Sequence, residues 1–501
     1  MHFLGIDIGT SAVKAVLVDE DETVVAAASA PLATRRPRPT WAEQDPDDWW
    51  RATERVIADL RAQPSGAFAG VRGIGLTGQM HGAVILDEAD AVIRPSILWN
   101  DGRAVAECES LRAKVPALAE TAGIGAMPGF TAPKLMWIKR NEPESFARIR
   151  MVLLAKDYVR LRLTGEHATD TSDAAGTLMF DEAARRWSEP IVAATGIRGD
   201  ALPPVLEGPT WSGMVRAELL AAWGIDHQVV VAGGAGDVAG AAIAVGAIND
   251  GDQFVSLGTS AQIFVGRDRY RPQPDTLIHT FAHAVPERWY AMEAVLNGAA
   301  CLDWLAGVLG ESDLDRLLGE AEYGFDGPSP VVFLPYLSGE RTPLNDPDAR
   351  GAFAGLSEAT GRAQLVRAVI EGVALSLKEA ALAFGDALGG DPIPMIGGGA
   401  RSPLWMLVLA STLGRPLLKL AGGDHTGPAL GAARLARMAA TGQSVAEVCA
   451  QPALVEIVDP HPGLQEAYAK RLETTRALYA ALRRPKPAPP ATADLPRRAR
   501  R

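Results

Sequence analysis

The sequence has little cysteine, and none of it is paired. The 501 residues include three cysteines, Cys108, Cys301 and Cys449, which are far apart and form no CxxC motif. Such thiols argue against a disulfide framework or a structural zinc site, and they are typical of a reducing compartment. We therefore expect a cytoplasmic protein.

The sequence also lacks an uncharged apolar run long enough to cross a membrane. The most apolar stretch, residues 229–248, contains Asp237 and five glycines. A central Asp opposes insertion into a bilayer by roughly 2.5–3.5 kcal/mol. We expect a buried strand, a glycine loop and a helix there. The first residues have no basic region or cleavage site of a secretory signal, so we expect no membrane partner.

No excess of positive charge is available for nucleic acid. There are 49 Lys and Arg against 60 Asp and Glu, a net charge of -11. Residues 483–501 are the exception, with seven basic residues, abundant Pro and Ala and no apolar period, and we expect a disordered tail. Because phosphate neutralisation supplies most nucleic-acid affinity, we expect no such partner. An anionic ligand would have to be bound by groups at its own site, such as backbone amides, a metal or a few cationic side chains.

One short pattern occurs twice. An apolar strand, a Gly-Thr-Ser turn and a second apolar strand span residues 3–18, and the same arrangement returns at residues 254–265. The repeat predicts two similar domains, 1–248 and 249–482, each opening with a glycine hairpin.

Strand and helix patterns alternate between and after these hairpins, which predicts α/β architecture. A helix is indicated from Pro46, with Asp45 as its N-cap. The remaining predicted elements are strands at 71–76, 93–99 and 394–396 and helices at 365–384 and 428–440.

Two carboxylates stand out because their surroundings are apolar. Asp7 lies inside the first strand, where it could serve a divalent cation or simply bond to the turn amides. Asp237 follows the glycine loop where a helix would begin. It could accept a proton from a substrate hydroxyl or act only as a helix cap.

Other segments suggest ligand contacts. The glycine turns at 258–260 and 397–402 could expose amides to phosphate, although no Walker A motif or protein-kinase motif is present. Met80 and His81 follow a strand, and with Trp99, Asn100 and Asp101 they would suit one wall of a polyol pocket. A lone His is more often structural than catalytic.

Taken together, the chain resembles the FGGY family of carbohydrate kinases from about residue 3 to about residue 480. The stretches that carry the resemblance are GIDIGTSAVKAVLVD, WAEQDPDDWWRAT, GQMHGAVILD, ILWNDGR, MPGFTAPKLMW, DTSDAAGTLMFD, SLGTSA, FLPYLSGERTPLNDP, GGGARS and GPALGAARLA. The resemblance implies two actin-like, ribonuclease-H-like domains hinged around a central catalytic cleft. The sugar would bind mainly to the first domain, 1–248, and ATP mainly to the second, 249–482.

The resemblance also implies roles for particular residues. Asp237 would be the general base and Asp7 would help to hold Mg²⁺. Sugar contacts would come from Met80, His81 and Trp99 as well as Asp237. The implied ATP-binding positions are Thr10, Ser11, Gly258, Thr259, Gly398 and Ser402.

The implied activity is ATP-dependent phosphorylation of D-xylulose to D-xylulose 5-phosphate. The partners would be the pentulose and ATP, and by analogy with relatives a second copy in a homodimer. Two departures from the family pattern keep alternatives open. Val238 stands where many relatives have Asn or Gln, so another polyol, such as ribulose, a pentitol, glycerol or gluconate, remains an alternative substrate. The apolar segment 405–411 after Ser402 could alter nucleotide affinity. A less favoured alternative is an actin-like ATPase without sugar kinase activity.

Overall fold

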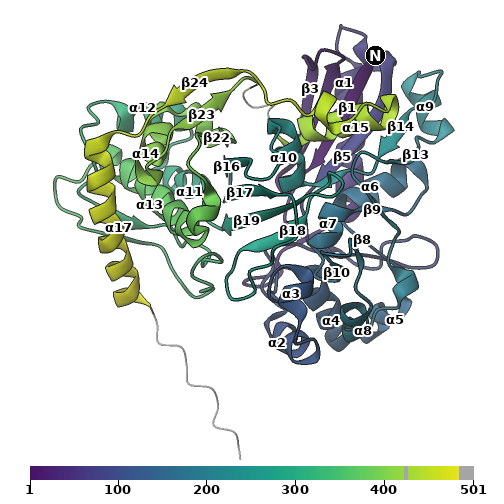
Figure 1. Ribbon diagram of the computed structural model, residues 1–501, viewed down its shortest axis with the longest axis horizontal. Coiled ribbons are helices and arrows are strands. Elements are labelled where there is room, and N and C mark those ends of the chain that lie inside the picture. The colour runs from purple at the N-terminus through teal and green to yellow at the C-terminus, as the bar shows by residue number, and fades with distance from the viewer. Residues whose placement is uncertain (423–426, 484–501) are drawn as a thin grey trace, which may run out of the picture.

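The computed structural model describes residues 1–422 and 427–483. Figure 1 shows two lobes, each built on a twisted sheet with helices packed against it. This confirms the predicted α/β architecture with two similar halves. The predicted basic tail lies outside the described residues, apart from Arg483.

The first sheet has the order β13-β14-β5-β1-β2-β3, with β15 also pairing with β5. Its strands are β1 (His2–Ile8), β2 (Ala12–Asp19), β3 (Val24–Pro31), β5 (Val71–Gly78), β13 (Trp211–Met214), β14 (Val230–Ala232) and β15 (Ala235–Gly236). β1 pairs antiparallel with β2 and parallel with β5. The first glycine hairpin is therefore present at the centre of this sheet.

The second sheet repeats this plan, with the order β18-β19-β17-β16-β22-β23-β24. Its strands are β16 (Gln253–Leu257), β17 (Ala261–Arg267), β18 (His279–Ala282), β19 (Trp289–Val295), β22 (Ile393–Ile396), β23 (Leu417–Leu420) and β24 (Leu454–Val458). β16 pairs antiparallel with β17 and parallel with β22, as β1 does with β2 and β5. The repeated Gly-Thr-Ser turn thus marks equivalent hairpins in two equivalent sheets.

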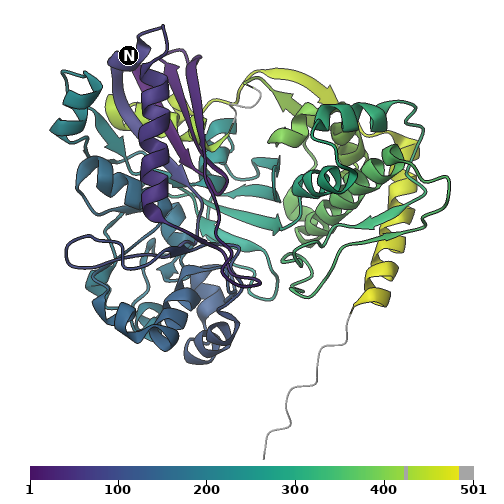
Figure 2. The ribbon, with the colours of Figure 1, turned by 180° about the vertical axis from the view of Figure 1, so that it is seen from behind.

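Helices cover both faces of the first sheet. α1 (Pro46–Arg61) crosses one face, as Figure 2 shows, and Asp45 caps it by accepting a hydrogen bond from the Asp47 N–H at 3.1 Å. α10 (Asp237–Val245) and α15 (Pro428–Thr441) lie on the other face. Figure 1 shows α15, from the second half of the chain, beside the N-terminal strands. The predicted domain division at residue 248 therefore remains a prediction.

Of the other helices, α6 (Ala155–Thr164) and α9 (Ala217–Trp223) pack against the first sheet, several more of the first half form an α-rich subdomain below it, and those of the second half surround the second sheet. The remaining helices of the first half are α2 (Val105–Lys114), α3 (Leu118–Ala122), α4 (Thr131–Asn141), α5 (Pro143–Arg148), α7 (Thr171–Ala175) and α8 (Glu189–Thr195). In the second half they are α11 (Ala300–Leu309), α12 (Leu314–Glu322), α13 (Arg362–Ala383), α14 (Pro403–Leu413), α16 (Val445–Val448) and α17 (Pro462–Leu482).

Short strand pairs complete the structure. They are β4 (Glu43–Gln44) with β7 (Ser96–Ile97), β6 (Val84–Leu86) with β8 (Met151–Leu153), β9 (Thr169–Asp170) with β12 (Val205–Leu206), β10 (Phe180–Asp181) with β11 (Arg186–Trp187), and β20 (Val332–Leu334) with β21 (Ala352–Ala354). The predicted strand at 93–99 is wrong in extent, because only Ser96–Ile97 pairs as β7. Pro95 lacks the N–H that a longer ladder would need.

Candidate active site

Asp7 lies near the carboxyl end of β1, opposite Thr77 on β5. The Thr77 hydroxyl donates a hydrogen bond to Asp7 Oδ1 at 3.1 Å, and Asp7 as a whole is 9% exposed. Burial raises the pKa of Asp7 to about 6, although Thr77 and Lys14 oppose that rise. Ligands of open α/β sheets bind beyond the carboxyl ends of the strands, which is where Asp7 stands.

Asp237 is the first residue of α10, directly after the glycine loop. Gly234 has a φ of 88°, a left-handed conformation that favours glycine and turns the chain out of β14. The helix N-cap is Gly236, so Asp237 is not the simple cap considered as an alternative. Among the described residues, its Oδ1 accepts a local bond from the Val238 N–H at 2.8 Å.

The two carboxylates influence each other across the first sheet. Burial raises the pKa of Asp237 to about 7, and the negative charge of Asp7 adds to that rise. A carboxylate with a pKa near neutrality can both accept and release a proton at physiological pH, as a general base must. The structure thus brings together the two acidic residues that the sequence singled out.

A buried ionic cluster beneath the glycine loop was missed by sequence reasoning. Lys156 Nζ lies 2.5, 2.9 and 3.0 Å from carboxylate oxygens of Asp157, Asp170 and Asp173, and all four side chains are buried. Arg160 lies beside it. The sequence signal for it was weak: Asp170 and Asp173 lie three residues apart in DTSDAAGTLMFD.

This cluster holds the backbone that precedes Asp237. The Arg160 guanidinium donates to the carbonyls of Ala232, at 2.7 Å, and Gly233. Ser172 Oγ accepts from the Gly236 N–H at 3.0 Å and donates to Asp170 Oδ2 at 2.5 Å. The backbone before α10 is therefore held by Arg160 and by Ser172, which Asp170 anchors in turn.

Met80 and His81 follow β5 and stand beside the Asp237 loop. A Cβ on Gly236 would lie 2.9 Å from Met80 Sδ, so the glycine permits this close approach. His81 has a φ of 71°, a conformation held by hydrogen bonds to its carbonyl from Thr131 Oγ1 at 3.0 Å and Lys134 Nζ at 2.8 Å. Strained backbone of this kind concentrates at functional sites.

The His81 ring has a defined tautomer. Nδ1 lies 2.6 Å from the carbonyl of Gly176, which can only accept, so Nδ1 carries the proton and Nε2 is left as an acceptor. Burial lowers the pKa of His81 to about 3, so the ring is neutral at physiological pH. It can therefore accept a hydrogen bond from a substrate hydroxyl.

A hydrogen-bonded network joins Trp99 to the first glycine turn. Trp99 Nε1 donates to Thr10 Oγ1 at 2.9 Å, and Thr10 Oγ1 donates to Gln79 Oε1 at 3.1 Å. The Thr10 hydroxyl is thus already occupied, whereas Ser11 is exposed. Asp101, in contrast, does not join this wall, because both its oxygens accept bonds from Arg103.

The remaining predicted positions gather on the second sheet. Gly258 and Thr259 follow β16, Gly398 follows the parallel strand β22, and Thr259 and Gly398 are exposed. A Cβ on Gly397 would lie 2.5 Å from the Leu257 carbonyl, so the two glycine turns touch. Ser402 is buried, and its hydroxyl accepts from the Trp405 N–H at 3.2 Å as the N-cap of α14.

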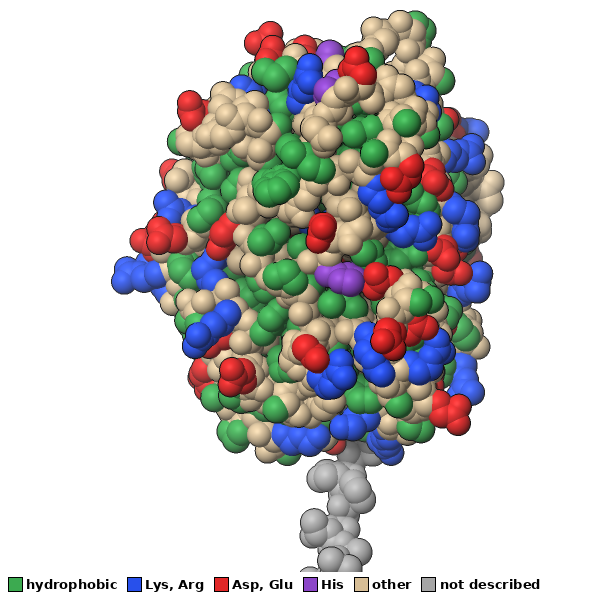
Figure 3. Space-filling model, turned by 90° about the vertical axis from the view of Figure 1, so that its right-hand side faces the viewer, with side chains coloured by type: hydrophobic (Ala, Val, Ile, Leu, Met, Phe, Trp, Pro, Cys, Tyr) green, Lys and Arg blue, Asp and Glu red, His purple; other side chains and the backbone are tan. Residues whose placement is uncertain are grey.

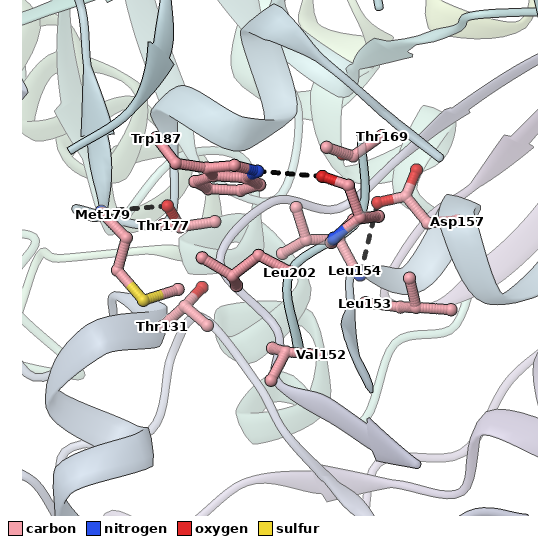
Figure 4. A pocket seen from close by; sticks show the side chains of 11 residues that line it. Thr131, Val152, Leu153, Leu154, Asp157, Thr169, Thr177, Met179, Trp187 and Leu202 are labelled. Atoms are coloured by element: carbon pink, nitrogen blue, oxygen red, sulfur yellow. Dashed lines mark hydrogen bonds between the residues drawn. The ribbon is translucent and has the colours of Figure 1, made fainter. Parts of the chain in front are cut away.

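The two hollows best defined by the described residues lie elsewhere. One is a cavity of about 10 Å³, with room for one water at most. Figure 4 shows side chains that line it, among them Thr131, Leu154 and Trp187. A groove of about 520 Å³ runs along β13. Neither contains a predicted site residue. Figure 3 shows one face of the first half, where charged and apolar side chains are intermixed.

Comparison with known proteins agrees with this arrangement. Residues 2–244 match the N-terminal domain of the FGGY family of carbohydrate kinases, and residues 254–440 match its C-terminal domain. The chain belongs to the FGGY family of carbohydrate kinases and has its two-domain fold.

Three relatives are close over nearly the whole chain. The chain is 45% identical over 480 residues to the xylulose kinase of Escherichia coli strain K12, covering 95% of this chain and 98% of that one. It is also similar to a solved xylulose kinase of Brucella ovis, with 44% identity, a TM-score of 0.88 and coverage of 96% and 99%. A solved xylulose kinase of Rhodospirillum rubrum gives 32% identity, a TM-score of 0.82 and the same coverage.

No helix within residues 1–422 and 427–483 is both long enough and apolar enough to span a lipid bilayer. The three cysteines are buried thiols, and burial raises the pKa of each to about 12. They are therefore inert packing residues at physiological pH.

Proposed function

We propose that this carbohydrate kinase phosphorylates D-xylulose to D-xylulose 5-phosphate, with ATP as donor and Asp237 as general base. The observation that carries the proposal is the position of Asp237 between Asp7, Met80 and the glycine loop. The xylulose kinases at 44–45% identity support the choice of sugar.

In the proposed reaction, Met80, His81 and Trp99 orient the sugar so that its terminal hydroxyl faces Asp237. The Asp237 carboxylate accepts the hydroxyl proton as the sugar oxygen attacks the γ-phosphorus. Backbone amides at Ser11 and at the Gly258 and Gly398 turns would hold the phosphates. Phosphoryl transfer depends mainly on such positioning and charge neutralisation. Closure of the two halves would exclude water, a competing acceptor.

The proposal includes Mg²⁺, because the Asp7 carboxylate is a suitable ligand for it. Asp7 Oδ1 accepts from Thr77, and its other oxygen has no partner among the described residues. Those residues contain no group of three His, Cys, Asp or Glu side chains that could hold a metal. Mg²⁺ needs no such group, because it is usually held by one or two carboxylates together with waters and substrate phosphates. Bound there, it would neutralise charge on the phosphates.

Val238 gives a specific reason to test a second polyol. Its side chain is 6% exposed and belongs to the apolar core, so this position offers the sugar no hydrogen bond. Ribulose, a pentitol, glycerol or gluconate is therefore the alternative acceptor. The apolar segment after Ser402 needs no functional explanation, because Trp405, Met406 and Val408 fill the core beneath the second sheet.

The test is ADP release with Mg²⁺ and ATP, measured for D-xylulose, D-ribulose, glycerol, gluconate, pentitols and no sugar. Preferential turnover of D-xylulose supports the proposal, and preference for another polyol overturns the choice of sugar. Turnover without phosphorylation of any sugar would favour an ATPase. Asp237→Asn should lower kcat by about 10²–10⁴-fold. The exposed Asp226→Asn is the matched control and should leave kcat unchanged.

A homodimer and a cytoplasmic location complete the proposal. The buried free thiols support a reducing compartment. Light scattering on the purified protein would measure its mass, and a mass of about 53 kDa, that of one 52.9 kDa chain, would contradict the dimer. Fractionation of the producing cell would test the location.

A further inference from the structure

The stretch SGERTP contains an arginine that the proposed mechanism has not used. Arg341 lies in the loop between β20 and β21, on the second half of the chain, and its side chain is partly exposed. The resemblance to known kinases gave this stretch no role.

The residues on either side of Arg341 are fixed. The Glu340 carboxylate, 2% exposed, accepts from the Leu296 N–H and the Arg341 N–H, each at 2.8 Å. Thr342 is buried. Its Oγ1 donates to the Ala294 carbonyl at 2.6 Å and accepts from the Ala294 N–H at 3.0 Å. The arginine is thus held against the end of β19.

This anchoring places Arg341 beside the second glycine turn. Residues 296–298 follow β19, and the Gly298 N–H donates to the Thr259 carbonyl at 3.0 Å. Asn297 Nδ2 donates to the Gly339 carbonyl at 2.7 Å, which ties the loop to the same segment. Residues 296–298 therefore connect the loop that carries Arg341 to the proposed phosphate-binding turn at Gly258 and Thr259.

The guanidinium forms no direct ion pair with a carboxylate of the described residues. Within residues 1–422 and 427–483, no carboxylate lies within 4.0 Å of it, and its single protein bond runs from Nε to the Ala294 carbonyl at 3.4 Å. By comparison, Arg434 is paired with Glu22 and Arg185 with Glu207. A guanidinium without a directly bonded carboxylate keeps N–H donors available for a ligand.

The groups that face Arg341 come from both halves of the chain. They are Asp237 on α10, His81 after β5, His279 on β18, Glu293 on β19 and its neighbour Glu340. Burial dominates the pKa of Asp237 and raises it, whereas the charge of Arg341 opposes that rise. The guanidinium is therefore close enough to act electrostatically on the proposed base.

We propose that Arg341 binds the γ-phosphoryl group of ATP during its transfer. In this step the sugar oxygen forms a bond to the γ-phosphorus. The bond from phosphorus to the β,γ-bridging oxygen breaks, and its electron pair stays on ADP. The hydroxyl proton passes to Asp237. The proposal rests on the proposed kinase function and names a further catalytic residue for it.

An arginine suits this position for two reasons. Its planar fork of N–H donors matches two phosphoryl oxygens at once, and it stays charged when partly buried. Because it comes from the half that would hold ATP and faces the half that would hold the sugar, it would engage the phosphoryl group only when both substrates are aligned. Such an interaction raises kcat rather than affinity.

The experiment compares Arg341→Met and Arg341→Lys with wild type and with Arg350→Met as matched control. Arg350 lies in the same loop and is exposed, and within the described part of the chain its side chain donates to the carbonyls of Pro347 and Ala349. We expect Arg341→Met to lower kcat by about 10²–10³-fold. The dissociation constant for the sugar alone, measured by calorimetry, should stay within about threefold. The kcat of Arg341→Lys should lie between those of wild type and Arg341→Met, because lysine keeps the charge but loses the planar fork of donors.

Two outcomes would overturn the assignment. One is a folded Arg341→Met variant with kcat within about threefold of wild type. The other is weaker sugar binding with kcat unchanged, which would make Arg341 a ligand of the sugar. The wild-type sugar panel distinguishes this failure from that of the proposed function. If wild type prefers another polyol, the same kcat comparison is made with that acceptor. If wild type phosphorylates none of the sugars, the kcat of ATP hydrolysis is compared instead.

Discussion

At the scale of single residues, the site depends on a carboxylate whose proton affinity is raised by its surroundings. Asp237 is enclosed by apolar neighbours and lies near the negative charge of Asp7, so its pKa is raised to about 7. A base works only when it is deprotonated. Raising its pKa therefore moves the loss of activity to a higher pH than an ordinary Asp would allow.

We accordingly expect kcat/KM to rise with pH and to reach a plateau above about pH 7. Below that pH, Asp237 is protonated and cannot take the hydroxyl proton. The measurement is a pH profile from 5 to 9 with the phosphorylated sugar, together with circular dichroism to show that the fold persists. A profile that stays flat down to pH 5 would contradict the assignment of Asp237.

Lys156 provides a second prediction at this scale. Its ammonium group is fully buried among three carboxylates, so Lys156→Met leaves them without their shared cation. Removing one partner of a buried ionic group typically costs about 3–5 kcal/mol. Denaturant unfolding should show a loss of that size. The control is Lys470→Met, which breaks the exposed Lys470–Glu466 pair and should change stability by less than about 1 kcal/mol.

At the scale of secondary-structure elements, the close contact of α15 with the first sheet depends on missing side chains. A Cβ on Gly5 would lie 1.8 Å from the Ala429 carbonyl, and a Cβ on Gly75 would lie 1.8 Å from the Ala432 carbonyl. Both obstacles are backbone atoms of α15 and cannot rotate away. Glycine at these two strand positions is therefore required by packing.

Gly75→Ala should destabilise the protein by about 3 kcal/mol, the upper end of the usual overpacking range, because the helix must shift to make room. Thermal unfolding measures this loss. The matched control is Gly319→Ala in the exposed interior of α12, where a Cβ meets nothing within 4 Å. That change should stabilise by about 0.5–1 kcal/mol. Equal effects of the two substitutions would contradict the packing argument.

The elements also show what the sequence could and could not predict. The hairpins around Gly9 and Gly258, the helix beginning at Pro46 and the helix before Gly246 were predictable, because apolar period, caps and turns are local signals. The strand at 93–99 was predicted too long, since its apolar residues pack in an irregular segment with only Ser96–Ile97 paired.

The contacts that hold the site in place could not be predicted, because they join residues far apart in the sequence. Arg160 contacts Gly233 across 73 positions, and the Trp99 indole contacts Thr10 across 89. Asp7 and Asp237 could be singled out as polar residues in apolar surroundings. Nothing in the local pattern indicated that they would lie near each other, nor that Arg341 would face them from the other half.

At the scale of the whole molecule, the two halves are not independent. α15 covers an apolar cluster of the first sheet that includes Phe3, Val16 and Val18. The Arg434 side chain reaches Glu22 Oε2 at 2.6 Å and the Ile243 carbonyl at 2.8 Å, which fastens the helix to the first half. Without α15 these apolar side chains would be open to water.

We therefore expect residues 1–248, produced alone, to be unstable or insoluble, although the predicted domain division would let them fold. Co-production with residues 249–501 should restore a soluble complex, because α15 is then supplied in trans. Solubility and circular dichroism of each fragment and of the pair provide the measurement. Arg434→Met in the second fragment should weaken the rescue. A cooperatively folded 1–248 fragment would contradict this view.

The position of α15 also constrains the order of events during synthesis. The first sheet is complete in the nascent chain by residue 236, but the helix that covers it ends at Thr441. At about 5–20 residues per second, the ribosome needs roughly 10–40 s more to deliver that helix. During that interval the apolar face of the N-terminal strands is exposed to water. The emerging chain is then a natural client for a chaperone at the ribosomal exit.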